Sequence, residues 1–187
     1  MSRLGLRGRK VQQGFSLITA LLFMVAALIL GVSVVGINAI QERMIGNTKD
    51  RELAMQAAEA ALRDAEFDIS RNLDVTSAFT DDCGAGLCTP PSQRATPSAL
   101  AVQDQPGFAW TDADKVRGYG VFTAAAAFPS VARQPVYVIE KLGSMGLPPG
   151  ESLLDPTVTG KTAYRITARA TGARVDTVVV LQSVYSR

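Results

Sequence analysis

The 187-residue chain contains no histidine, one tryptophan and two cysteines. Histidine is the commonest general base and its imidazole is the commonest metal ligand, so its absence argues against an enzyme. The chain also lacks a G-x-S-x-G motif, which would mark the nucleophile of a serine hydrolase. We therefore predict no catalytic residue, no cofactor and no metal site.

Positive charge no longer exceeds negative charge once the start of the chain is set aside. The formal net charge is +2, and it includes four basic residues at positions 3, 7, 9 and 10. Without those four residues the remainder carries a net charge of −2. The sequence therefore offers no basic surface of the kind that binds nucleic acid.

Charged residues are missing altogether between residues 15 and 40. A helix that rises about 1.5 Å per residue needs about 20 apolar residues to cross a bilayer, and this run of 26 residues is long enough. It is about twice as long as the apolar part of a secretory signal peptide, which disfavours a signal of that kind. The basic residues before it predict a cytoplasmic leader and a domain on the opposite side of the membrane.

Proline is absent from the first 89 residues, so a helix that begins in the apolar run can continue beyond it. Within residues 50–73, apolar side chains recur at spacings of three and four, which predicts an amphipathic helix on a core. These side chains are Met55, Ala58, Leu62, Ala65, Ile69 and Leu73. We expect one helix over residues 15–73, with Gly31, Gly36 and Gly46-Asn47 as weak points.

Proline and glycine become frequent between residues 74 and 114, where we predict an irregular loop with one short helical turn. Cys83 and Cys88 lie inside this loop. Two cysteines beyond a membrane span fit one structural disulfide. A zinc or redox site would need further ligands or a C-x-x-C spacing, and neither is present.

Two pairs of acidic residues are the remaining candidates for a metal site. Asp81-Asp82 and Asp112 with Asp114 supply carboxylate oxygens that calcium favours. Neither pair belongs to a recognisable loop with six or more spaced oxygen ligands, so we interpret both as solvated turn residues.

Four segments near the end of the chain are rich in β-branched and aromatic residues, namely 116–128, 136–142, 164–170 and 175–185. Apolar and polar residues alternate in the third segment, as in a half-buried strand. Gly172 follows it and supplies a turn toward the last segment. We predict an α+β fold in which a long N-terminal helix packs on an antiparallel sheet of about four strands.

The predicted organisation therefore has four parts. Residues 1–14 form a leader, and residues 15–40 form the transmembrane or assembly half of the helix. Residues 41–73 form its amphipathic half, and residues 74–187 form a globular domain with the disulfide loop and the sheet.

The start of the apolar run resembles the class III signal of type IV prepilins. A basic leader ends at Gly14, and Phe15-Ser16-Leu17-Ile18-Thr19 heads the apolar helix. The resemblance implies a type IV pilin-like fold. It also implies that prepilin peptidase cleaves between Gly14 and Phe15 and that Phe15 becomes N-methylated.

The stretch after the apolar run resembles the PilX group of minor pilins in particular. The matching residues are Gln41-Glu42-Arg43-Met44, Gly46-Asn47, Asp50-Arg51 and Gln56-Ala57-Ala58-Glu59-Ala60-Ala61-Leu62-Arg63. The resemblance implies a minor pilin of the type IV pilus within a priming complex that initiates assembly and caps the fibre, and it implies roles in twitching motility and adhesion.

Thr19 departs from the usual pattern of this family. The fifth residue of a mature pilin is generally glutamate, which pairs with the N-terminal ammonium of a neighbouring subunit. A subunit without this carboxylate suits the first or topmost position of the fibre, where no earlier subunit supplies an amine. Alternatively, Thr19 is a tolerated substitution in a subunit that lies elsewhere.

The partners implied by the resemblance are prepilin peptidase, other minor pilins, the major pilin and a tip-associated adhesin. We expect the sheet face and the loop over residues 74–114 to make these contacts. The implied location is the inner membrane before assembly, with the domain in the periplasm, and then the pilus tip. The rival hypotheses are a bitopic inner-membrane protein whose uncleaved helix presents a periplasmic binding domain, and a periplasmic enzyme.

Overall fold

The computed structural model describes residues 15–74, 76–95, 100–101, 104–144 and 161–187, and for residues 33–39 it describes the backbone alone. The chain divides into two compact units, Met1–Gly46 and Asn47–Arg187. Each unit is described by itself.

Helix α1 (Phe15–Arg71) is an uninterrupted helix of 57 residues. It begins where the sequence predicts and ends slightly before the expected residue 73. The boundary between the two units follows Gly46, one of the predicted weak points. A Cβ built on Gly46 would meet no atom within 4 Å, so close packing in the described part of the chain does not require glycine there.

The second unit is built on a mixed sheet with the strand order β1-β3-β4-β5. Strands β3 (Val136–Ser144), β4 (Thr162–Thr171) and β5 (Val178–Ser186) form an antiparallel meander. The short strand β1 (Leu87–Cys88) pairs with β3 in parallel, and β2 (Arg117–Gly118) pairs with β3 antiparallel. Two short 3₁₀ helices, η1 (Gly84–Gly86) and η2 (Pro91–Gln93), lie on either side of β1.

This architecture confirms the predicted α+β class and the three long strands, with two differences. The sheet is mixed because β1 joins it in parallel. The predicted strand over 116–128 is wrong, because only Arg117–Gly118 pairs with the sheet. Beyond it, Asp64 of α1 accepts a hydrogen bond from Gly120 N at 2.9 Å and another from the Thr123 hydroxyl, so the helix binds this segment instead.

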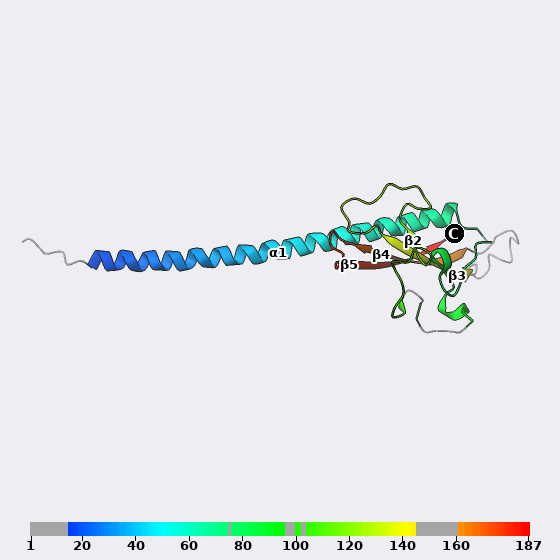
Figure 1. Cartoon of the computed structure of the whole chain (residues 1–187), viewed down its shortest axis with the longest axis horizontal. Helices are drawn as coiled ribbons and strands as arrows, with labels where there is room; N and C mark the ends of the chain where they lie inside the picture. The colour runs from blue at the N-terminus through cyan, green and yellow to red at the C-terminus, as the bar shows by residue number, and fades with distance from the viewer. Residues whose placement is uncertain (1–14, 75, 96–99, 102–103, 145–160) are drawn as a thin grey trace, which may run out of the picture. The chain divides into compact units, whose positions relative to one another are not determined.

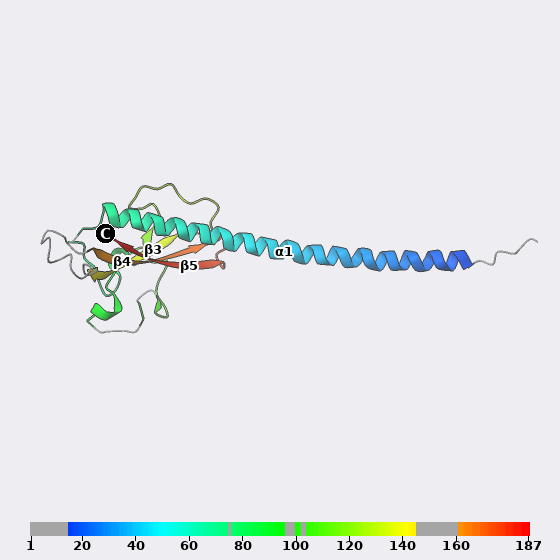
Figure 2. The same cartoon turned by 180° about the vertical axis from the view of Figure 1, so that it is seen from behind.

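The helix face that packs on the sheet is lined mainly by alanine. Figures 1 and 2 show, from opposite sides, the last turns of α1 lying along strands β3 to β5. Ala61, Ala65 and Ile69 are fully buried and share a core with Ile139, Ile166 and Ala168 of the sheet. The other buried apolar helix residues are Ala54, Ala57 and Ala58. Met55 of the predicted stripe is exposed, so the buried face is centred on the alanines instead.

A buried ion pair also joins the helix to the rest of the domain. Asp68 accepts a hydrogen bond from Arg117 Nε at 2.6 Å and one from the Tyr137 hydroxyl at 3.0 Å. Both the aspartate and the arginine are buried. Burial, followed by the negative charge of Asp68, raises the pKa of Tyr137, so the tyrosine stays protonated and donates to the carboxylate.

The opposite face of the sheet is covered in part by the loop that carries the disulfide. Val138 points away from the helix, because it lies between Tyr137 and Ile139, which both face the helix. A disulfide joins Cys83 and Cys88, and both cysteines pack with Val138 and Val116. The half-buried Phe108 and Trp110 complete this second cluster.

Candidate functional site

The first part of α1 carries the largest apolar surface among the described residues. The stretch Phe15–Val32 is long and apolar enough, by length and composition, to cross a membrane. Its large apolar side chains are 46–76% exposed, beginning with Phe15 at 73%. An apolar surface that surrounds a helix needs lipid or neighbouring apolar helices around it. This stretch is therefore suited to a membrane anchor.

Thr19 lies in the second turn of this stretch and bonds within its own helix. Its hydroxyl donates to the carbonyl of Ser16 at 3.0 Å and to that of Phe15 at 3.2 Å. The polar group is thus satisfied locally and brings no charge into the apolar surface. Gly14 lies outside the described residues, so cleavage after it and N-methylation of Phe15 stay predictions.

Asp50 binds the helix to the turn between β4 and β5. Its Oδ1 atom accepts hydrogen bonds from Ala173 N at 2.6 Å and from Arg174 N at 3.4 Å. Gly172 packs so closely on this carboxylate that a Cβ there would collide with it. Hydrogen bonds from the Thr177 side chain and from these two amides lower the pKa of Asp50, partly opposed by desolvation. The predicted turn at Gly172 thus meets the helix directly.

The roles of Asp50, Asp64 and Asp68 escaped the sequence prediction, although a signal was present. They occupy one stripe with three alanines, at positions 50, 54, 57, 61, 64 and 68, where the spacings alternate between four and three. Small residues in such a stripe indicate close approach of another element. Aspartates at the same spacing then indicate acceptors for the backbone amides or the cations of that element.

Strand β5 presents a second apolar surface on the side of the sheet away from the helix. Val179 and Leu181 pack toward α1. The alternate residues Val178, Val180 and Val184 are exposed by 40%, 50% and 63%. No further strand among the described residues pairs with β5. Edge strands usually carry charges or proline that block pairing, and β5 has neither. The three valines and this edge, which we call the β5 surface, suit contact with another subunit.

The acidic pairs hold turns of the loop. Asp81 accepts a hydrogen bond from Ala95 N at 3.0 Å, and Asp112 accepts one from Asp114 N, also at 3.0 Å. A hydrogen bond from the Thr80 hydroxyl lowers the pKa of Asp82. In the part of the chain that the structure describes, no three or more histidine, cysteine, aspartate or glutamate side chains gather where they could hold a metal ion.

The chain matches two models of known protein families. Residues 84–187 match the family model described as type IV pilus assembly protein PilX C-term, and residues 13–63 match the PilX N-terminal model. The first match covers Cys88 and the whole sheet, and begins one residue after Cys83. The second covers the apolar stretch and Asp50. Searches of curated proteins and of solved structures returned no match. Since the C-terminal match alone covers more than half of its length, the chain belongs to the PilX family of type IV pilus assembly proteins.

Proposed function

We propose that this chain is a minor pilin of a priming complex, which initiates assembly of the type IV pilus and then caps the fibre, supporting twitching motility and adhesion. The observation that carries the proposal is Thr19. Its hydroxyl is bonded within its own helix and carries no charge, at the position where pilins generally have a carboxylate.

Electrostatics supports a position at the tip. A charged side chain inside a membrane span is costly, about 3 kcal/mol at the helix centre on insertion scales, when nothing neutralises it. A pilin inside the fibre recovers this cost by pairing with the amine of the subunit before it. The first subunit has no such neighbour, so a neutral residue is the better choice there. A threonine that donates to its own backbone avoids the cost of an unpaired charge.

The apolar stretch supports assembly by extraction from a membrane. Before assembly it lies in the inner membrane, with the domain in the periplasm. After prepilin peptidase has cut between Gly14 and Phe15, the mature chain begins with N-methylated Phe15. Each Å² of apolar surface exposed to water costs about 25 cal/mol. The stretch must therefore pass directly from lipid into a bundle of similar helices, which a growing fibre provides.

The β5 surface supports lateral contacts within the tip. Its three valines bury apolar area against a neighbour, and its free edge can pair with a strand of that neighbour. The neighbours in this proposal are other minor pilins, the major pilin below them and a tip-associated adhesin. The disulfide-bearing loop lies next to β3, on the side of the sheet away from α1, and offers a second contact.

Piliation of cells in which retraction is blocked tests the tip position. We expect deletion of this chain to reduce surface pili strongly, Thr19→Ala to restore them and Thr19→Glu to restore them poorly. The reason is that glutamate at the tip would carry an unpaired carboxylate in an apolar environment. Normal piliation and twitching in the deletion strain would refute the priming role. Full activity of Thr19→Glu would refute the tip position alone.

The intact mass of the chain extracted from membranes separates this proposal from a permanent membrane anchor. A processed pilin begins at methylated Phe15, whereas an uncleaved anchor retains the residues before it. A mass that includes Gly14 in the pilus fraction would contradict processing at the proposed site.

A further inference from the structure

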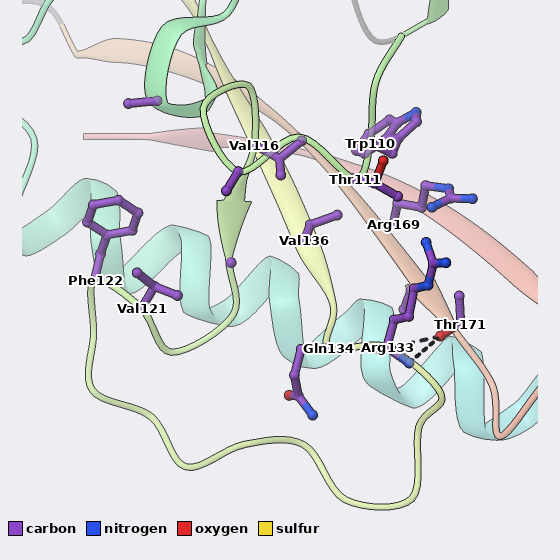
Figure 3. Close-up of a pocket in the computed structure, with 14 residues that line it drawn as sticks. Trp110, Thr111, Val116, Val121, Phe122, Arg133, Gln134, Val136, Arg169 and Thr171 are labelled. Atoms are coloured by element: carbon purple, nitrogen blue, oxygen red, sulfur yellow. Dashed lines mark hydrogen bonds between the residues drawn. The ribbon is translucent and has the colours of Figure 1, made fainter. Parts of the chain in front are cut away.

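A cavity of about 380 Å³ opens on the side of the sheet away from α1, and the assembly role above does not use it. It lies between the loop around Trp110 and Val116, the segment that follows β2, and the adjoining parts of β3 and β4 (Figure 3). Val116, Val121 and Val136 form apolar walls. Val121 is one of the most exposed apolar side chains of the domain, so the apolar lining continues to the surface.

Two arginines stand at one end of the cavity. Figure 3 shows Arg133 and Arg169 on the side of Trp110, with Val121 and Phe122 at the other end. The backbone of Arg133 is held by Thr171, whose hydroxyl accepts from Arg133 N at 3.1 Å. The Arg169 guanidinium lies 5.9 Å from the centre of the Trp110 ring. The fold thus holds the backbone of Arg133 at the cavity and sets the Arg169 side chain against the Trp110 ring.

Neither of these two arginines forms an ion pair with a carboxylate among the described residues. The ion pairs found among the described residues involve other arginines. Partial burial, followed by the positive charge of Arg133, lowers the pKa of Arg169. Two like charges beside an apolar cavity raise the free energy of the unbound protein, and an anion between them relieves that cost.

We propose that this cavity binds an acidic side chain of a partner polypeptide, together with an apolar side chain next to it in that partner. A guanidinium donates two parallel hydrogen bonds to a carboxylate, which a neutral amide cannot match. The apolar walls accept the neighbouring side chain, and the volume suits one or two side chains better than a large cofactor. The choice of a polypeptide rests on the proposed function, because the neighbours of a pilin in a fibre are polypeptides.

The fluorescence of Trp110 provides a direct test. It is the only tryptophan of the chain and it lines the cavity. The full chain in mild detergent is titrated with acetyl-Glu-Phe-amide and, in parallel, with the neutral acetyl-Gln-Phe-amide. We expect a saturable change with the glutamyl peptide and binding weaker by about tenfold or more with the glutaminyl peptide, since a charge-assisted hydrogen bond is lost.

Variants of the two arginines assign the effect to this site. We expect Arg169→Gln and Arg133→Gln each to weaken binding of the glutamyl peptide by about tenfold. Arg174→Gln is the matched control, because Arg174 is an exposed arginine of the β4–β5 turn outside the cavity lining. Circular dichroism of each variant verifies folding. Since Arg133 is exposed and makes no ion pair among the described residues, its replacement leaves the fold intact.

Several outcomes would overturn the proposal. These are equal binding of both peptides, no saturable change up to about 10 mM peptide, and unchanged affinity in both arginine variants. Benzoate that binds as tightly as the glutamyl peptide would assign the cavity to small carboxylates and overturn the choice of a polypeptide. The titration and the deletion experiment are independent of each other. If the peptide does not bind but deletion of the chain still abolishes piliation, this inference is refuted and the proposed function stands.

Discussion

Replacing Asp68 by asparagine should destabilise the domain strongly, because it leaves a buried arginine without its counterion. The carboxylate accepts from Arg117 Nε at 2.6 Å, from Arg117 Nη2 at 3.4 Å and from the Tyr137 hydroxyl at 3.0 Å. The Asp68 side chain is completely buried and the Arg117 side chain is 5% exposed. Asparagine has nearly the same shape, so the change removes the charge and creates no cavity.

The magnitude follows from the burial of the pair. Breaking a buried ion pair by removing one partner costs about 3–5 kcal/mol of the free energy of unfolding. That is a large part of the 5–15 kcal/mol by which typical domains are stable. Urea unfolding followed through Trp110 fluorescence measures it. With a slope of about 1–3 kcal/mol per molar urea, the midpoint should fall by about 1 M or more.

Two further variants control this experiment. Asp176→Asn removes the partner of Arg174 in an ion pair at 4.0 Å, whose side chains are 82% and 66% exposed. It should cost less than about 1 kcal/mol, because exposed pairs are screened by water. Adding Arg117→Met to Asp68→Asn should restore part of the lost stability, because neither residue of the former pair then carries a buried charge. A loss below about 1 kcal/mol for Asp68→Asn would refute the reasoning.

Two other predictions concern the remaining links within the domain. Hydrogen bonds keep the pKa of Asp50 low in the folded state, so its contribution is present above its unfolded pKa of about 4 and is lost as the pH falls. The difference in urea stability between the wild-type chain and Asp50→Asn should therefore shrink below about pH 4, and a constant difference would contradict the assignment. Reducing the disulfide between Cys83 and Cys88 should lower the free energy of unfolding by about 2 kcal/mol, because the loop it closes is short. Urea titration with and without dithiothreitol measures this loss, and Cys83→Ser with Cys88→Ser should abolish the effect of the reductant.

The elements that the sequence predicts well are those with a local cause. The apolar run and the absence of proline predict α1 because both act on consecutive residues. Alternation in Tyr164-Arg165-Ile166-Thr167 predicts β4 for the same reason. The segment after β2 has an equally strand-like composition, but its Gly120 amide donates a hydrogen bond to Asp64, which lies far away in the sequence. A local pattern contains no information about such a distant acceptor.

The candidate functional residues also differ in whether a local sequence pattern reveals them. The disulfide is predictable because the chain has only two cysteines, close together in one loop. Phe15 and Thr19 are singled out by a short motif, and their roles in processing and assembly stay predictions. The cavity is not recognisable, because Trp110, Arg133 and Arg169 come from separate segments that only the folded sheet brings together. The parallel pairing of β1 is equally hidden, since two residues are too few for a periodic pattern.

The contact between Asp50 and the β4–β5 turn has a mechanical consequence. Residues 40–49 of α1 are exposed, and Asp50 is the first buried residue after them. A load pulled along the helix therefore reaches the folded domain first through one carboxylate and the amides of Ala173 and Arg174. Acid removes the charge that holds the same contact. Tension and protonation thus act on the same contact, that of Asp50 with the β4–β5 turn. We expect force to unfold the domain first at this contact, and we expect low pH to lower the force that is required.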